Sequence, residues 1–119
     1  MRATIALTPL LWLASGVAQS QEPSTPDPQR LREAISRLGE VNGQALACHL
    51  LDPASSARVL MLKHSPRTAE FGRLFEKSTE AGFSAQLALR SPCPSARELA
   101  GQLEVIALQL RELSPSDGP

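Results

Sequence analysis

Apolar residues recur at alternating steps of three and four along two segments of the chain. In the later segment the stripe runs over most of three heptads: Ala96, Leu99, Leu103, Ile106, Leu110 and Leu113. The earlier segment carries a similar stripe: Leu31, Ile35, Leu38, Asn42 and Ala45. Because this spacing places each stripe on one face of an α-helix, both segments are predicted to be amphipathic helices.

Two further helices are predicted between these segments. One contains the unbroken apolar run Val59-Leu60-Met61-Leu62, and the other places Phe71, Leu74, Phe75 and Ser78 on one face. A capping side chain beside a proline marks three helix starts, at Asp27-Pro28, Asp52-Pro53 and Ser65-Pro66. The last helix starts with a capping box, since Ser95 and Glu98 have the Ser-x-x-Glu spacing.

Together these signals predict an all-α fold, a small four-helix bundle with helices at about 28–49, 53–64, 66–82 and 95–113. Gly82 is predicted to stop the third helix in a left-handed conformation. The pattern over 84–90 fits either a continued helix or a loop. No alternating strand pattern competes with the helices.

The first twenty residues have the pattern of a cleavable export signal. Met1-Arg2 is followed by an apolar run over 5–14 and a small-residue tail over 15–20. A membrane anchor is the alternative, but this run is shorter than the roughly 20 residues that span a bilayer. We therefore expect a signal peptide at 1–20, a disordered leader at 21–26, a helical domain at 27–113 and a flexible tail at 114–119, in a periplasmic or secreted protein, with the bacterial periplasm favoured.

Charge and aromatic content exclude several classes of partner. Removing the signal leaves 11 basic against 12 acidic residues with the signs interspersed, which provides no basic footprint for nucleic acid. The only aromatic residues that remain are Phe71, Phe75 and Phe83. Sites that stack bases or sugars therefore lack most of their usual side chains. No membrane span is expected after the signal is removed.

Two cysteines in an exported chain predict one disulfide. Cys48 ends the first long helix and Cys93 precedes the last, so antiparallel packing of those helices brings the two sulfurs to one end of the bundle. The bridge would close a loop of about 46 residues, which corresponds to about 4 kcal/mol of loop-closure entropy.

A metal site is the alternative interpretation of the same region. Cys48, His49 and Cys93, together with Met61 and His64 three residues apart on one helix face, offer the soft ligands that suit copper or zinc. The chain has no Cys-x-x-Cys pair and no His-rich tract, and adjacent residues on a helix diverge by about 100°. The disulfide is therefore preferred, and no cofactor is expected.

Small residues at helical spacing indicate how the first helix packs. Gly39, Gly43 and Ala47 lie at i, i+4 and i+8, although a glycine inside a helix costs about 1 kcal/mol relative to alanine. A close approach by the backbone of another helix would offset that cost, and a hinge is the alternative. The close approach is preferred.

The apolar run of the second helix is the predicted binding surface. Four consecutive apolar residues cover most of a helix circumference, so the helix is either sandwiched between two others or exposes part of the run to a partner. Val59, Leu60 and Met61 are the predicted contact residues.

Catalysis has few candidate groups. Asp occurs only at Asp27, Asp52 and Asp117, and His49 and His64 are the only bases that titrate near neutrality. No nucleophile motif or metal-protease motif is present. We expect a non-catalytic binding protein of the cell envelope, an adaptor, inhibitor or chaperone-like protein with a protein or peptide partner. The alternatives are a small periplasmic copper or zinc carrier and a bundle that holds an apolar ligand between helices near Phe71 and Phe75.

Overall fold

The computed structural model describes residues 27–90 and 92–113, which form four helices and, within those ranges, no strand. The helices are α1 (Pro28–Ala47), α2 (Leu51–His64), α3 (Ala69–Ala88) and α4 (Ala96–Leu113). The predicted all-α four-helix fold is therefore confirmed. The predicted signal, leader and tail lie outside the described residues.

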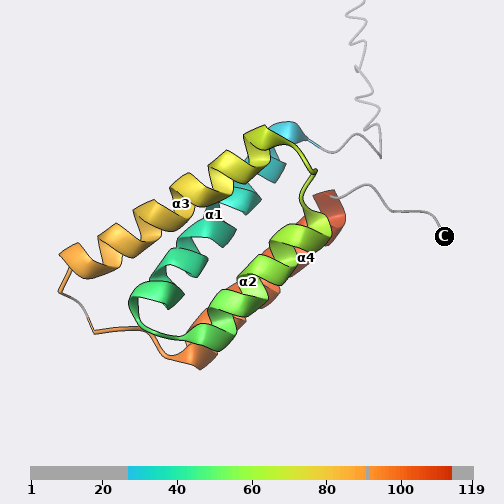
Figure 1. Cartoon of the computed structure of the whole chain (residues 1–119). Helices are drawn as coiled ribbons and strands as arrows, with labels where there is room; N and C mark the ends of the chain where they lie inside the picture. Colours follow the sequence, from blue (N-terminus) through green and yellow to red (C-terminus); the bar gives the residue numbers. More distant parts are fainter. Residues whose placement is uncertain (1–26, 91, 114–119) are drawn as a thin grey trace, which may run out of the picture.

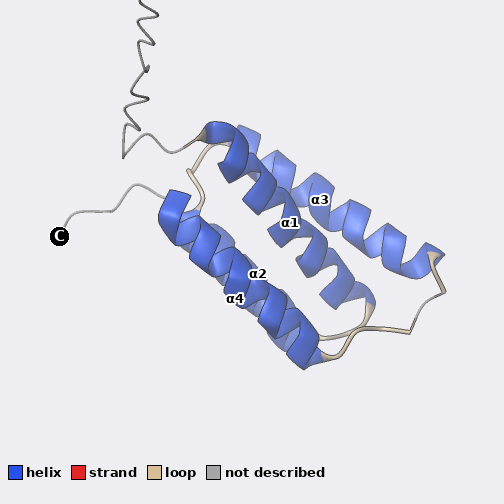
Figure 2. Cartoon of the chain, turned by 180° about the vertical axis from the view of Figure 1, so that it is seen from behind, coloured by secondary structure: helices blue, strands red, loops and turns tan. Residues whose placement is uncertain are grey.

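The helices alternate in direction along the chain, and α1 occupies the centre. Figures 1 and 2 show α3 along one side of α1, with α2 and α4 together along the other side. α1 packs against all three other helices and α2 packs against α4, whereas α3 packs almost entirely against α1. As a result α1 and α3 form one parallel pair, and α2 and α4 form another.

The hydrophobic core lies where α1, α2 and α4 meet. Its largest fully buried side chains are Ile35, Leu38, Leu99, Ile106 and Leu110. These belong to the two stripes with the clearest heptad spacing. α3 contributes Phe71 to the core, with Leu74 and Phe75 packed at its edge. The helical periodicity of α1 and α4 thus provides most of the buried apolar surface, while α3 covers one flank.

The α1–α3 contact is made through small residues. A Cβ atom at Gly39 would lie 2.5 Å from the Cβ of Ser78, and one at Gly43 would overlap the backbone of Thr79. On α3, a Cβ at Gly82 would overlap the backbone of Glu40. The predicted close approach of another helix to the α1 glycines is confirmed.

Polar side chains connect the two closely packed backbones. The hydroxyls of Ser36 and Ser78 lie 3.1 Å apart, Asn42 donates from Nδ2 to Thr79 Oγ1, and Gln44 donates from Nε2 to Gln86 Oε1. At the start of the pair, Arg32 Nη2 lies 2.8 Å from Glu70 Oε1. Because α3 buries little apolar surface, these bonds and the close backbone packing are its main links to the rest of the protein.

Two of the four predicted helix starts are confirmed. Asp27 caps α1 by accepting a hydrogen bond from the backbone N–H of Gln29, and Ser95 accepts one at 3.1 Å from the N–H of Glu98 before α4. In both cases the side chain satisfies a backbone donor that has no partner inside the helix. Short-range capping geometry was sufficient to place these two starts.

The other two predicted starts are wrong. α2 begins at Leu51 after an uncapped Leu50, so Asp52 and Pro53 lie inside its first turn, where a proline is tolerated because the N–H has no helical partner. Ser65 is the C-cap of α2, and Thr68 caps α3 three residues later. The predicted start at 66 falls in the linker that reverses the chain.

The predicted stop at Gly82 is also wrong. α3 continues to Ala88, so 84–88 is helix, and the chain leaves the helix through Leu89 and Arg90, whose φ is 48°. Gly82 has a helical conformation inside α3 and lies against the backbone of Glu40. Its missing side chain permits close packing rather than a left-handed turn.

None of the helices within residues 27–90 and 92–113 is long and apolar enough to cross a lipid bilayer. α4 illustrates why, since its apolar stripe covers one face and charged residues such as Arg97 and Glu104 interrupt the rest. The amphipathic pattern belongs to a helix packed on a protein core.

Candidate functional site

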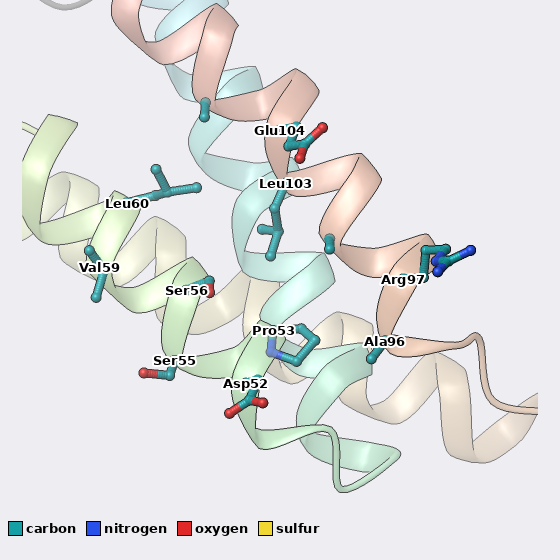
Figure 3. A pocket seen from close by; sticks show the side chains of 12 residues that line it. Asp52, Pro53, Ser55, Ser56, Val59, Leu60, Ala96, Arg97, Leu103 and Glu104 are labelled. Carbon is teal, nitrogen blue, oxygen red and sulfur yellow. The ribbon is translucent and has the colours of Figure 1, made fainter.

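A groove runs between the parallel helices α2 and α4. It encloses about 740 Å³. Residues of α2 and of α4 line it in equal number, and in Figure 3 the side chains of Leu60 and Leu103 project into the space between the two helices. We call this the α2–α4 groove. Its lining residues are Asp52, Pro53, Ser55, Ser56, Val59 and Leu60 on α2, and Ala96, Arg97, Ala100, Leu103, Glu104 and Ala107 on α4.

The groove exists because alanines line its α4 side. Ala96, Ala100 and Ala107 lie at i, i+4 and i+11, which places them on one stripe beside the leucine stripe of the core. Larger side chains in this stripe would fill the space between α2 and α4. The sequence pattern placed Ala96 in the core stripe, whereas the structure leaves it exposed at the groove, and it did not single out Ala100 or Ala107. The helix that these alanines face is not visible from the sequence.

The floor of the groove is apolar and its charged side chains are at the edges. Leu103 is buried, Leu60 is half-buried and Val59 is 55% exposed. In Figure 3 the side chains of Arg97 and Glu104 point away from α2. An apolar surface with a polar edge is the arrangement found in the centre and rim of protein interfaces.

Two of the three predicted contact residues lie in this groove. Val59 and Leu60 line it, and Leu60 also packs against the core. Met61 packs against the core as well but does not line the groove. Leu62 is exposed outside the groove. The apolar run is therefore divided between core, groove and solvent, because successive residues on a helix point about 100° apart.

Cys48 and Cys93 form the predicted disulfide, with their Cα atoms 5.8 Å apart. The bridge joins the end of α1 to the segment before α4, and the side-chain amide of Gln86 donates towards Cys93 Sγ at 3.9 Å. Since α2 also begins three residues after Cys48, the bridge lies at the end of the bundle where both helices of the groove start.

The residues of the alternative metal site are not brought together. Cys48 and Cys93 bond to each other. His49 precedes α2 and His64 ends it, so the 14 residues of that helix separate them by about 20 Å. Met61 and His64 do share one part of α2. Across residues 27–90 and 92–113, no group of three or more His, Cys, Asp or Glu side chains is placed to hold a metal ion.

His49 instead occupies a backbone turn. Its φ is 57°, its N–H donates to the carbonyl of Leu46, and the N–H of Leu50 donates to the carbonyl of Ala45. This pair of bonds is the Schellman arrangement that ends a helix, and its left-handed position usually holds glycine. The exposed side chain takes no part in it.

Replacing His49 with glycine should stabilise the protein. We expect His49→Gly to raise the free energy of unfolding by about 0.5 to 1 kcal/mol, because glycine adopts a positive φ without the steric cost of a Cβ atom. Urea unfolding measures the change. His49→Ala, which keeps the Cβ atom, is the control and should change stability by less than about 0.5 kcal/mol. A stability loss in both variants would show instead that the imidazole itself contributes.

His64 lies at the opposite end of α2. Burial lowers the pKa of His64, with a further lowering from the nearby charges of Lys63 and Arg111. The neutral imidazole is therefore favoured more in the folded protein than in the unfolded chain. This part of the contribution of His64 to stability is present above the unfolded pKa and is lost as the pH falls towards the folded one.

The predicted ligand site near Phe71 and Phe75 divides between two environments. Phe71 is buried in the core, where it fills space beside α1. Phe75 is half-buried and borders a separate depression together with two glutamates. Carboxylates beside the ring are poor neighbours for a lipid-like molecule, because a charged group loses solvation when apolar surface covers it.

No protein family, curated protein or solved structure matches the chain. The geometry of the α2–α4 groove and the chemistry of its lining are therefore the basis for a functional proposal.

Proposed function

We propose that the protein is an exported, non-catalytic binding protein that holds an amphipathic helix of a protein partner in the α2–α4 groove. The observation that carries this proposal is the groove itself, an apolar trough of about 740 Å³ between two helices, lined by Val59 and Leu60. An adaptor, inhibitor or chaperone-like role fits this mode of binding.

The dimensions of the groove favour a short helix as its occupant. Its α4 side extends from Ala96 to Ala107, a rise of about 16 Å, or roughly three helical turns. A helix of that length presents two or three large apolar side chains at i, i+4 and i+7, the pattern of helix-in-groove recognition. The low alanine wall leaves room for those side chains.

The polar edges favour a partner helix that is itself amphipathic. Asp52 and Arg97 lie at the end where α2 and α4 begin, and Glu104 lies on the α4 side further along. Charges of both signs at the rim contribute to orientation more than to affinity. The partner should therefore carry polar residues on the face that remains in water.

Substitution of Val59 by glutamate tests the groove. Site-specific photo-crosslinking from Ser56, a groove residue on the same helix, would be carried out in the source cells, and the affinity of the captured partner would then be measured in vitro. Val59→Glu should weaken binding at least about tenfold, because it places a charge on the apolar wall. Since Val59 is 55% exposed, the helical content should not change.

Leu87→Glu is the matched control. Leu87 is 60% exposed on α3, outside the groove, and undergoes the same apolar-to-acidic change. The proposal requires a crosslinked partner that is lost with Val59→Glu and retained with Leu87→Glu. Equal loss in both variants, or no crosslink from any groove position, would contradict it.

A further inference from the structure

The side of α2 that faces away from the bundle is apolar at both of its ends. Leu51 and Leu62 are 70% and 76% exposed. They are eleven residues apart, close to three helical turns, so their side chains leave the helix in nearly the same direction. Ala57 is fully buried and points about 120° to 140° away from both leucines. α2 packs on α1 and α4 and lies at the outside of the bundle, in front of α4 in Figure 1.

A charged residue follows each of these leucines. Asp52 is in the first turn of α2 and Lys63 is in the last turn. Both are exposed, and neither has an ion-pair partner among residues 27–90 and 92–113. Their signs complement the helix dipole, but the dipole does not explain the exposed leucines beside them. We call Leu51, Asp52, Leu62 and Lys63 the outer face of α2.

The outer face is complementary to itself when the helix is reversed. In an antiparallel pair of α2 helices, the first turn of one copy lies beside the last turn of the other. Leu51 of one copy then meets Leu62 of the second, and Asp52 meets Lys63. A twofold axis forms each contact twice, which gives two leucine pairs and two ion pairs from one helix face. A parallel pair would instead place Asp52 against Asp52 and Lys63 against Lys63.

We propose that two copies of the chain associate through the outer faces of α2, packed antiparallel about a twofold axis. Self-complementary charge at the two ends of the face is the observation that identifies a second copy as the partner. Ser55, exposed between the two leucines, has a small side chain that lets the helices approach each other near the axis. Arg58 lies at the other edge of the face, where its long side chain can extend into water.

The dimer leaves the floor of the α2–α4 groove open. Leu60 projects into the groove in Figure 3 and points about 160° to 180° away from Leu51 and Leu62. Neither leucine lines the groove. The proposed dimer therefore does not rest on the proposed function, and either can fail alone. Val59 is exposed and borders both surfaces, so the test of the dimer leaves it unchanged.

Sedimentation equilibrium of the full chain, with its disulfide intact, tests the dimer. A contact between two helices of 14 residues is at the small end of specific interfaces, so we expect a dissociation constant between about 1 and 100 μM. Leu62→Glu should weaken dimerisation at least about tenfold, because it places a carboxylate against Leu51 of the second copy. The helical content should not change, since Leu62 is exposed. Leu87→Glu, the same change on α3, is the control and should leave the dissociation constant unchanged.

Charge reversal tests the antiparallel arrangement. Asp52→Lys and Lys63→Asp should each weaken dimerisation about threefold to tenfold, because each turns two attractive ion pairs into two repulsive ones. The variant with both substitutions re-forms the two pairs with exchanged signs and should recover most of the lost affinity. In a parallel dimer like charges would face each other in the parent and in all three variants, so none would differ from the parent.

The outcomes separate this dimer from the groove. A chain that stays monomeric up to about 1 mM, equal weakening by Leu62→Glu and Leu87→Glu, or a doubly reversed variant no better than the single ones would overturn the proposal. The photo-crosslink from Ser56 should be retained in Leu62→Glu, because Leu62 lies outside the groove. A dimer without that crosslink would contradict only the proposed function, and a crosslinked partner without a dimer would contradict only this inference.

Discussion

Gly43→Ala should destabilise the protein by about 2 kcal/mol, although alanine is the better helix former. A Cβ at this position would overlap the carbonyl of Thr79 and come within 2.6 Å of the backbone nitrogen of Phe83. Neither backbone atom can move aside as a side chain could. α3 must therefore shift away from α1, and the cost of such overpacking exceeds the gain of about 1 kcal/mol from helix propensity.

Two other glycines provide controls of the same chemistry. Gly72 in α3 and Gly101 in α4 are helical, and apart from the backbone of its own helix and its chain neighbours a Cβ at either would have no atom within 4 Å. Gly72→Ala and Gly101→Ala should each raise the free energy of unfolding by up to about 1 kcal/mol. Urea unfolding of the three variants should therefore give changes in the free energy of unfolding of opposite sign. It should fall in Gly43→Ala and rise in Gly72→Ala and Gly101→Ala.

Hydrogen exchange would show in which helices Gly43→Ala lowers the protection of backbone amides. Because α3 packs almost entirely against α1, its amides should lose protection in Gly43→Ala more than those of α2 and α4. If Gly43→Ala stabilised the protein as Gly72→Ala does, the close α1–α3 packing would be refuted. Equal loss of protection in every helix would mean that the fold opens only as a whole.

Removal of the disulfide should cost more. Cys48→Ala combined with Cys93→Ala should lower the free energy of unfolding by about 4 kcal/mol, the loop-closure entropy of a bridge between residues 45 apart in sequence. A typical small domain has only about 5 to 15 kcal/mol in total. The variant should therefore unfold at much lower urea concentration than the parent protein.

Reductant and the denaturant slope provide the controls for this effect. The parent protein in excess reductant should unfold at nearly the same urea concentration as the double variant, which is insensitive to reductant. The dependence of the free energy on urea should be steeper without the bridge, because the unfolded chain is then less compact. A stability loss below about 1 kcal/mol would show that the bridge constrains the unfolded chain little.

The two predictions concern different parts of the architecture. The bridge connects α1 to the start of α4 and so supports the bundle end at which the α2–α4 groove begins. The glycines determine only how α3 lies on α1. Variants of Gly43 should therefore disturb the α1–α3 contact before the α2–α4 groove.

Most features that depend on short-range chemistry were predictable from the sequence. The stripes ending at Ala45 and Leu113 identified the buried faces of α1 and α4, and Asp27 and Ser95 located two helix starts. Periodicity and capping involve residues within about one turn of each other, so neighbours along the chain are enough to recognise them. The α2 and α3 starts were misplaced because the residues beside those prolines fall within a first turn or a linker.

Gly82 illustrates what local pattern cannot decide. A glycine followed by an apolar residue is a common helix ending, yet here α3 continues for six more residues, and Gly82 instead permits the close approach of the Glu40 backbone. The role of that glycine depends on a helix about forty residues earlier in the chain. Likewise, Met61 and Val59 belong to one apolar run, but only the positions of α1 and α4 separate core from groove.

By itself, then, the sequence determined the helical class, the buried faces of the two long helices and the pairing of Cys48 with Cys93, because periodicity and cysteine count express these directly. Only the tertiary structure decided that α1 pairs with α3 through glycines, that α2 lies parallel to α4, and that an alanine stripe faces Val59 and Leu60 across an open groove. The reason is physical. A stripe of side chains specifies which face of a helix is covered, but the neighbour that covers it depends on how all four helices share one core.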